Sequence, residues 1–199
     1  MNVTVGVLAL QGAFSAHQRV LAHLGVATHQ VRLPRDLDAV DALVMPGGES
    51  TTMSQLLESS GLFDAIAGRI SDGMPVLGTC AGIILLAGEV LDGRADQRSF
   101  GALPITVRRN GYGRQIDSFE AEVDVVGLDE PFTAVFIRAP IIERVGDGIE
   151  ILASHEGRPI AVASDRLVGA TFHPELTDDA RFHGAFVDRV LSQVSTSRR

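Results

Sequence analysis

The strongest structural signal in this chain is the stretch Met74-Pro75-Val76-Leu77-Gly78-Thr79-Cys80-Ala81-Gly82-Ile83-Ile84-Leu85-Leu86-Ala87. An apolar run that stops at a glycine and then resumes predicts a strand that turns sharply into a buried helix. Glycines two residues away on both sides of Cys80 allow the strained turn that exposes the nucleophile in Gly-x-Ser-x-Gly enzymes. The helix behind the sulfur places its positive end there, which favours thiolate over thiol. The stretch therefore predicts a strand-turn-helix unit and suggests covalent catalysis by Cys80.

Two interpretations of Cys80, the one cysteine of the chain, remain open on this local pattern. A lone cysteine in an apolar stretch is often a small buried hydrophobe without chemistry. A nucleophile also needs a base and an oxyanion site, so the rest of the chain has to supply both.

Strands and helices alternate through the first half of the chain. Buried strands are predicted at residues 3–10, 28–33 and 42–45, and helices at residues 13–24, 51–58 and 62–70. This order is typical of a parallel, doubly wound sheet. The second half predicts short strands at 103–108, 120–126, 134–138, 149–155, 160–163 and 167–172, and a closing amphipathic helix at 178–194. We expect an α/β fold with a mixed sheet and one domain over residues 1–199, with a polar tail that frays from about residue 192.

Composition narrows the classes of function. The chain has 199 residues, of which 45% are hydrophobic, so it can build a substantial core. A formal charge of −8 argues against a nucleic-acid surface. The first apolar run has no basic residues before it and is too short to span a membrane, so we expect no membrane partner. A single cysteine forms no internal disulfide, which fits the cytoplasm.

A base and an orienting carboxylate follow the strand at 167–172, in His173-Pro174-Glu175. Proline favours extended backbone in the residue before it, and side chains two residues apart then point to the same side. His173 and Glu175 can therefore form the pair that a cysteine nucleophile requires, although a surface turn is the plain alternative. The other histidines (His17, His23, His29, His155 and His183) have no comparable setting, and their spacing predicts no metal site with Cys80.

An oxyanion site is predicted at Pro46-Gly47-Gly48-Glu49-Ser50-Thr51-Thr52, which follows the strand at 42–45. Adjacent glycines can present backbone N–H groups, and Ser50 or Thr51 can cap the next helix. The loop lacks the Gly-Lys-Ser/Thr ending of a phosphate-binding loop. The N–H groups of Gly48 and Ala81 are better suited to hold a developing negative oxygen, with a plain glycine turn as the alternative.

Together, Gly-Thr-Cys-Ala-Gly, Pro-Gly-Gly-Glu-Ser-Thr and His-Pro-Glu resemble the motifs of class I (triad) glutamine amidotransferases. Within that class the chain resembles the family of glutaminase subunits of pyridoxal 5′-phosphate synthase, the PdxT family. The narrower resemblance rests on motifs between residues 6 and 177: Gly6-Val7-Leu8-Ala9-Leu10-Gln11-Gly12, Pro46 to Met53, Arg109-Asn110, Gly113-Arg114-Gln115, Asp117-Ser118-Phe119-Glu120, Phe136-Ile137-Arg138-Ala139-Pro140 and His173-Pro174-Glu175-Leu176-Thr177.

The resemblance implies a three-layer, flavodoxin-like fold and a Cys80–His173–Glu175 triad without a cofactor or a metal. It also implies glutamine-binding residues and, at Gln11, a residue of the partner interface and the oxyanion region. The implied glutamine-binding residues are Gly48, Glu49, Ser50, Arg109, Ile137 and Arg138.

The reaction implied by the resemblance is hydrolysis of L-glutamine to L-glutamate and ammonia. The implied partner is a PdxS-type synthase subunit in a large hetero-oligomer, which makes pyridoxal 5′-phosphate from ribose 5-phosphate and glyceraldehyde 3-phosphate. Three alternatives stay open: another amidotransferase such as imidazole glycerol phosphate synthase, a cysteine peptidase or chaperone of the PfpI group, and a non-catalytic interaction subunit. Many members of the PfpI group place a histidine directly after the cysteine, where this chain has Ala81.

Overall fold

The computed structural model describes residues 3–109 and 118–197, and its centre is a seven-stranded mixed sheet. Its strands are β1 (Thr4–Leu8), β2 (Ala27–Val31), β3 (Ala42–Met45), β4 (Val76–Thr79), β10 (Glu150–His155), β11 (Arg158–Ala163) and β12 (Leu167–Ala170). They lie in the order β10-β11-β12-β4-β3-β1-β2. The five adjacent strands from β12 to β2 run parallel to one another, whereas β11 runs antiparallel to both β12 and β10. The mixed sheet with an antiparallel edge is thus confirmed.

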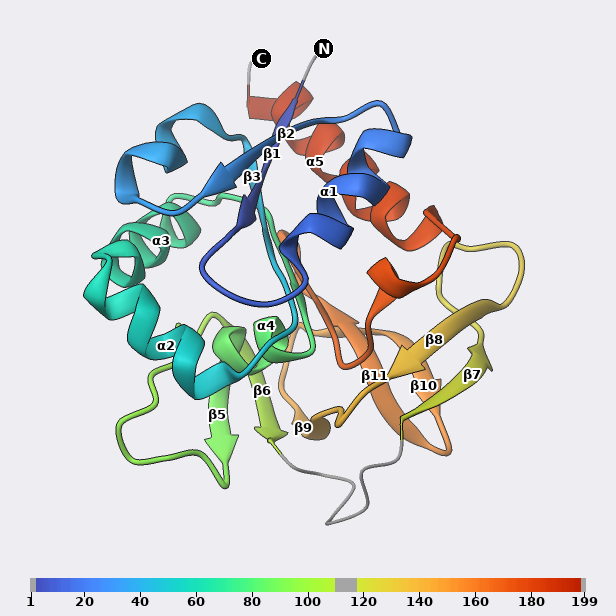
Figure 1. Ribbon diagram of the computed structural model, residues 1–199. Coiled ribbons are helices and arrows are strands. Elements are labelled where there is room, and N and C mark those ends of the chain that lie inside the picture. The colour runs from blue at the N-terminus through green and yellow to red at the C-terminus, as the bar shows by residue number, and fades with distance from the viewer. Residues whose placement is uncertain (1–2, 110–117, 198–199) are drawn as a thin grey trace.

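Helices cover both faces of this sheet (Figure 1). They are α1 (Phe14–His23), α2 (Ser50–Ser59), α3 (Leu62–Ser71), α4 (Ala81–Leu86) and α5 (Arg181–Ser197), with short 3₁₀ turns η1 (Pro34–Ala39) and η2 (Pro174–Leu176). α1 and α5 pack on one face, in a core that includes Phe132, Phe136, Phe172 and Phe186. α2, α3 and α4 pack on the other face. Three layers with two cores agree with the predicted doubly wound fold.

Two smaller sheets complete the described part of the chain. β5 (Ala87–Leu91), β6 (Leu103–Arg108) and β9 (Ile141–Val145) form one, and the hairpin β7 (Phe119–Val123) and β8 (Phe132–Phe136) forms the other. The hairpin packs its alternate side chains, Phe132, Ala134 and Phe136, into the core beneath α5. In this way β8 reaches the end of β12, where the candidate site lies.

Two strands of the structure were not predicted. The run 83–87 indicates a helix throughout, but α4 ends at Leu86 and the chain continues as β5. Gly88 allows this change, because a Cβ there would lie 3.2 Å from the carbonyl oxygen of Leu103 on the paired strand. The strand β9 escaped prediction because its two isoleucines are followed by two charged residues, so it shows neither alternation nor a continuous apolar run.

The C-terminal helix begins later and ends later than expected. α5 starts at Arg181 rather than residue 178 and keeps helical backbone to Ser197. Fraying of the tail from about residue 192 stays a prediction.

Candidate active site

Cys80 lies between β4 and α4 in a strained backbone conformation, with φ 49° and ψ −102°. A non-glycine residue with positive φ is uncommon, and such residues concentrate at functional turns. The flanking glycines are needed for packing, because a Cβ on Gly82 would clash with the carbonyl oxygen of Met45, and one on Gly78 would lie 2.7 Å from the backbone of Gly82. The N–H of Cys80 donates to the carbonyl of Ala170 at 2.8 Å, which ties this turn to β12.

His173 reaches Cys80 because their strands are neighbours. β4 and β12 are adjacent and parallel, so both chains leave the sheet at the same edge. His173 precedes η2, and its backbone N–H donates to the carbonyl of Val135 in β8 at 2.8 Å. Its side chain lines the same cavity as Cys80 and, like Cys80, packs against Gly47, and its Nδ1 lies 2.8 Å from Oε1 of Glu175. The structure therefore brings together the three residues that the sequence singles out.

Electrostatics favour a protonated His173 between Cys80 and the Glu175 carboxylate. Burial lowers the pKa of His173, but its hydrogen bonds and charge interactions with Cys80 and Glu175 outweigh burial and raise that pKa to about 10. Burial raises the pKa of Glu175, but the hydrogen bond from His173 and the electrostatic interactions with His17 and His173 keep that pKa below its usual value. A proton on His173 is thus stabilised by the groups on both of its sides.

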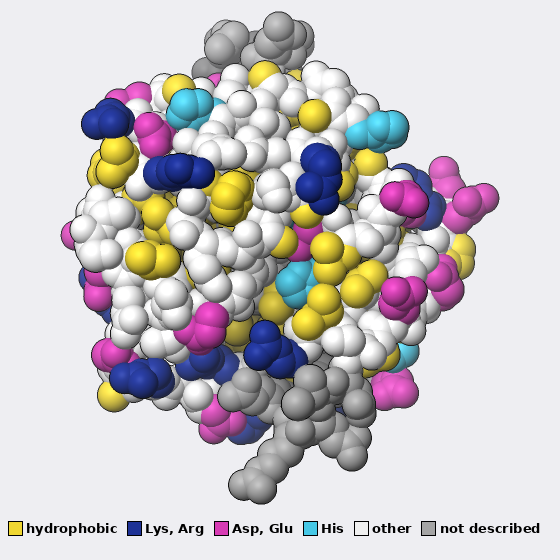
Figure 2. Space-filling model, in the orientation of Figure 1, with side chains coloured by type: hydrophobic (Ala, Val, Ile, Leu, Met, Phe, Trp, Pro, Cys, Tyr) yellow, Lys and Arg dark blue, Asp and Glu magenta, His cyan; other side chains and the backbone are white. Residues whose placement is uncertain are grey.

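A cavity of about 400 Å³ opens over the sulfur. Figure 2 shows a hollow near the centre of this face, in which a histidine side chain is visible. The predicted site residues that line the cavity are Gln11, Gly48, Glu49, Ser50, Cys80, Arg109, Ile137, Arg138 and His173. Ala81 and Glu175 are not part of its lining; Glu175 is buried behind His173.

The glycine loop before α2 packs directly against His173 and Cys80. A Cβ on Gly47 would clash with the ring of His173 and lie 3.3 Å from the Cβ of Cys80, so only glycine fits there. Gln11 holds the next turn, since its Oε1 accepts the backbone N–H of Glu49 at 3.0 Å. The N–H of Ala13 donates to the carbonyl of Gly47 at 3.3 Å. The segment between β1 and α1 thus supports the loop that follows β3.

Glu49 caps α2, so the prediction of Ser50 or Thr51 as the cap was wrong. The two carboxylate oxygens of Glu49 accept the N–H groups of Thr51 at 3.1 Å and Thr52 at 2.7 Å. Burial raises the pKa of Glu49, but these hydrogen bonds, the Thr52 hydroxyl and the charge of Arg109 outweigh it and lower that pKa to about 2. Glu49 therefore remains an anion at the mouth of the cavity.

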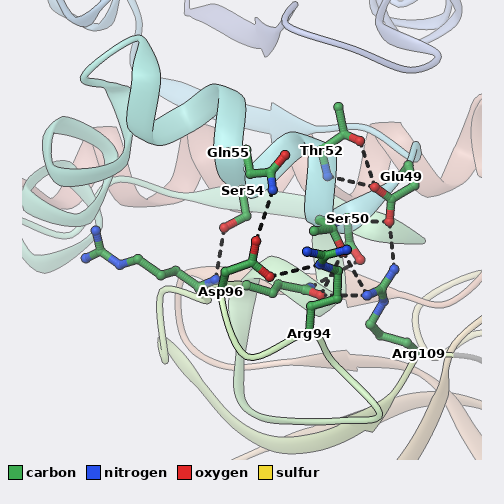
Figure 3. A network of polar contacts seen from close by, with 11 residues as sticks. Glu49, Ser50, Thr52, Ser54, Gln55, Arg94, Asp96 and Arg109 are labelled. Atoms are coloured by element: carbon green, nitrogen blue, oxygen red, sulfur yellow. Dashed lines mark hydrogen bonds and ion pairs between the residues drawn. The ribbon is translucent and has the colours of Figure 1, made fainter.

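Arg109 is held at the cavity by contacts with two other segments (Figure 3). It donates to Oε1 of Glu49 at 2.6 Å, to the hydroxyl of Thr51 at 2.8 Å and to Oε1 of Gln97 at 2.9 Å. Gln97 was not predicted, because it lies in the polar connection between β5 and β6 without a motif of its own. Arg138, which also lines the cavity, is exposed and has a positive φ of 46°.

Several residues of the resemblance lie outside the described part of the chain: Asn110, Gly113, Arg114, Gln115 and Asp117. Within the described part, no group of three or more His, Cys, Asp or Glu side chains could hold a metal ion. None of the described helices combines the length and hydropathy needed to cross a membrane.

Two histidines that the sequence did not indicate as site residues are buried behind Glu175. His17 lies on α1 and His183 on α5, and both are fully buried. The available signal was their place on apolar helix faces, with His17 one turn before Leu21 and His183 beside Phe182.

Comparison with known proteins shows the family of the chain. The model of the "SNO glutamine amidotransferase family" matches residues 7–192. A protein of a Nocardioides species named "Pyridoxal 5'-phosphate synthase subunit PdxT" is 52% identical over 195 residues, covering 96% of this chain and 97% of its relative. A protein of the same name from Herpetosiphon aurantiacus is 54% identical, covering 93% and 99%. A solved structure described as a glutamine amidotransferase is 43% identical with a TM-score of 0.88, covering 94% and 98%.

Proposed function

This chain belongs to the SNO glutamine amidotransferase family, and we propose that it hydrolyses L-glutamine through a triad of Cys80, His173 and Glu175. It is a glutamine amidotransferase, the glutaminase subunit of a pyridoxal 5′-phosphate synthase. The observation that carries the proposed triad is the position of His173, which lines one cavity together with Cys80 and places its Nδ1 2.8 Å from Oε1 of Glu175. This is the nucleophile–base–orienter arrangement of covalent amide hydrolysis.

In the acylation half-reaction, the thiolate of Cys80 forms a bond to the side-chain amide carbon of glutamine, and the carbonyl electron pair moves onto oxygen. The backbone N–H groups of Gly48 and Ala81 hold that oxyanion. Ala81 suits this role because it is the first residue of α4, whose N–H has no partner within the helix. When the oxyanion collapses, His173 transfers its proton to the departing nitrogen, so that ammonia and a γ-glutamyl thioester result.

In the deacylation half-reaction, His173 is neutral and accepts a proton from water. The oxygen of that water bonds to the thioester carbon, the carbon–sulfur bond breaks, and glutamate and the thiolate of Cys80 are released. Glu175 keeps Nδ1 of His173 protonated through the 2.8 Å contact, so that Nε2 is the nitrogen that exchanges protons.

The cavity mouth carries both signs of charge, which suits a zwitterionic amino acid. Glu49 is an anion, and Arg109 and Arg138 are cations, all on the lining of the same cavity. We place the α-ammonium and α-carboxylate of glutamine among these groups, beside Ser50 and Ile137. The volume of about 400 Å³ falls within the usual range for small-molecule sites.

We expect a partner enzyme to use the ammonia that this reaction releases. Ammonia released into neutral water is mostly protonated and then no longer a nucleophile, so direct transfer to an acceptor enzyme makes chemical sense. The names of the relatives support a synthase subunit in that place. We propose a PdxS-type subunit that uses ribose 5-phosphate and glyceraldehyde 3-phosphate, assembled with this chain into a large hetero-oligomer in the cytoplasm, and Gln11 as a residue of that interface.

The test compares wild-type and Cys80→Ala chains, each mixed with a PdxS-type subunit. We expect Cys80→Ala to lose glutamine hydrolysis by at least about 10³-fold. As a matched control, ammonium salts should still support pyridoxal 5′-phosphate formation in the same mixture, because the partner and the docked assembly are unaltered. Wild-type glutamine turnover in Cys80→Ala would overturn the proposal.

A further inference from the structure

A chain of buried polar contacts lies on the far side of Glu175 from the cavity. His17, in α1, places its Nε2 3.4 Å from Oε2 of Glu175 and 3.2 Å from the hydroxyl oxygen of Thr79. Its Nδ1 lies 2.8 Å from Nε2 of His183, in α5. Neither histidine lines the cavity over Cys80, so neither is placed to touch glutamine.

The two carboxylate oxygens of Glu175 have different surroundings. Oε1 is hydrogen-bonded to His173, whereas Oε2 is buried and forms no hydrogen bond with any described residue. A buried carboxylate oxygen without a donor is unfavourable. The nitrogen that faces Oε2 is Nε2 of His17, and the 3.4 Å separation is slightly longer than an ordinary hydrogen bond.

The proton positions follow from this arrangement. A neutral imidazole donates from one nitrogen and accepts at the other, whereas an ionised carboxylate only accepts. A lone pair on Nε2 of His17 would face the Glu175 anion, so the favourable form of His17 carries its proton on Nε2. Its Nδ1 then accepts the Nε2–H of His183 across 2.8 Å. In this arrangement His183 carries its proton on Nε2 and is the donor to His17.

Burial keeps both histidines neutral. It lowers the pKa of His17 to about 4 and that of His183 to about 3, although the charge of Glu175 acts in the opposite direction on both. The titratable groups that face Glu175 are His173 beside η2, His17 from α1 and, behind it, His183 from α5. At neutral pH the contact with His17 is therefore a neutral donor facing an anion.

We propose that His17 is a positioning residue that directs its Nε2–H toward Oε2 of Glu175 and the hydroxyl of Thr79, and so keeps Oε1 turned toward His173. The proposal rests on the proposed triad, because His17 acts only through Glu175. A carboxylate held at one oxygen can rotate about its last side-chain bond, whereas one held at both oxygens keeps its plane. The consequence is an imidazole of His173 that stays aligned with Cys80.

The first measurement determines the tautomer of His17 in the wild-type chain. Nitrogen chemical shifts of ¹⁵N-histidine-labelled full chain at neutral pH should show His17 protonated at Nε2 and bare at Nδ1, with its signals identified by their loss in His17→Gln. A proton on Nδ1 of His17 would overturn the proposal. This readout is independent of turnover, so a failure of the Cys80 assignment would leave it unaffected.

The second measurement compares His17→Leu with His17→Gln, each assembled with the synthase subunit. We expect kcat for glutamine hydrolysis to fall by about tenfold or more in His17→Leu, with KM little changed. Because Glu175 loses a donor, its pKa should rise, and activity should disappear at a higher pH as the solution is acidified. The side-chain N–H of Gln can replace Nε2–H, so His17→Gln should recover most of kcat.

The matched control is His29→Leu, which changes a half-exposed histidine of β2 and should keep the wild-type kcat and pH profile. Equal impairment of His17→Leu and His17→Gln would indicate a packing role and overturn the proposal, as would a wild-type profile in His17→Leu. If His17→Leu fails to fold, the tautomer measured in the wild-type chain decides.

Discussion

Replacing Glu175 by glutamine removes the negative charge behind His173 with little change of shape. The contact between Nδ1 of His173 and Oε1 of Glu175 is 2.8 Å long, and the Glu175 side chain is fully buried. A hydrogen bond to a charged group contributes about 1.5–3 kcal/mol, and one pKa unit corresponds to about 1.4 kcal/mol. We therefore expect the pKa of His173 to fall by about 1–2 units in Glu175→Gln.

The effect of Glu175→Gln on activity follows from the role of the proton on His173. The pKa of His173 is raised to about 10, so the imidazolium is present below that pH and is lost as the pH rises through it. Loss of the proton removes the acid that protonates departing ammonia. In Glu175→Gln the alkaline limb of the rate profile should therefore move to lower pH by about 1–2 units. A neutral amide also permits the wrong tautomer of His173, so kcat should fall roughly 10²–10⁴-fold.

The assay measures glutamate release by the complex with the synthase subunit across neutral and alkaline pH, together with single-turnover acylation. Glu130→Gln is the matched control, because Glu130 is exposed in the connection between β7 and β8 and the change is chemically identical. An alkaline limb that does not move in Glu175→Gln, or a kcat equal to that of Glu130→Gln, would refute the electrostatic account of His173.

Three further variants test the site and the core. Gly47→Ala should lower kcat by about 10²-fold or more, because the new Cβ would clash with the ring of His173. Its control is Gly68→Ala, in an open part of α3, which should leave kcat unchanged and stabilise the helix by about 1 kcal/mol. Arg109→Ala should raise KM for glutamine by about tenfold and change kcat less, as steady-state kinetics would reveal. Phe132→Ala, at a fully buried ring, should lower the free energy of unfolding by about 3–5 kcal/mol in denaturant titrations; a loss below 1 kcal/mol would contradict its place in the core.

Predictions succeeded where the physical signal was local. The glycines around Cys80 and the switch from an apolar strand to an apolar helix lie within a few residues, and the turn has the strained backbone that they indicate. The cap of α2 was predicted wrongly, because neighbouring polar residues can all cap a helix. Glu49 takes that role where its carboxylate also meets Arg109, a residue distant in the sequence, at 2.6 Å. The strand β9 was missed because it is defined by pairing with β6 rather than by its own pattern.

The residues alone predicted the α/β class and three groups suited to thiol chemistry: Cys80, His173 and Glu175. Periodicity, glycine spacing and side-chain chemistry are properties of short segments, so the sequence alone reveals them. The sequence did not predict that the side chains of His17 and His183 lie behind Glu175 as neutral imidazoles. Their contact and their lowered pKa values depend on α1 and α5 meeting on one face of the sheet and excluding water. Desolvation arises from the packing of the whole chain, so it has no local signature.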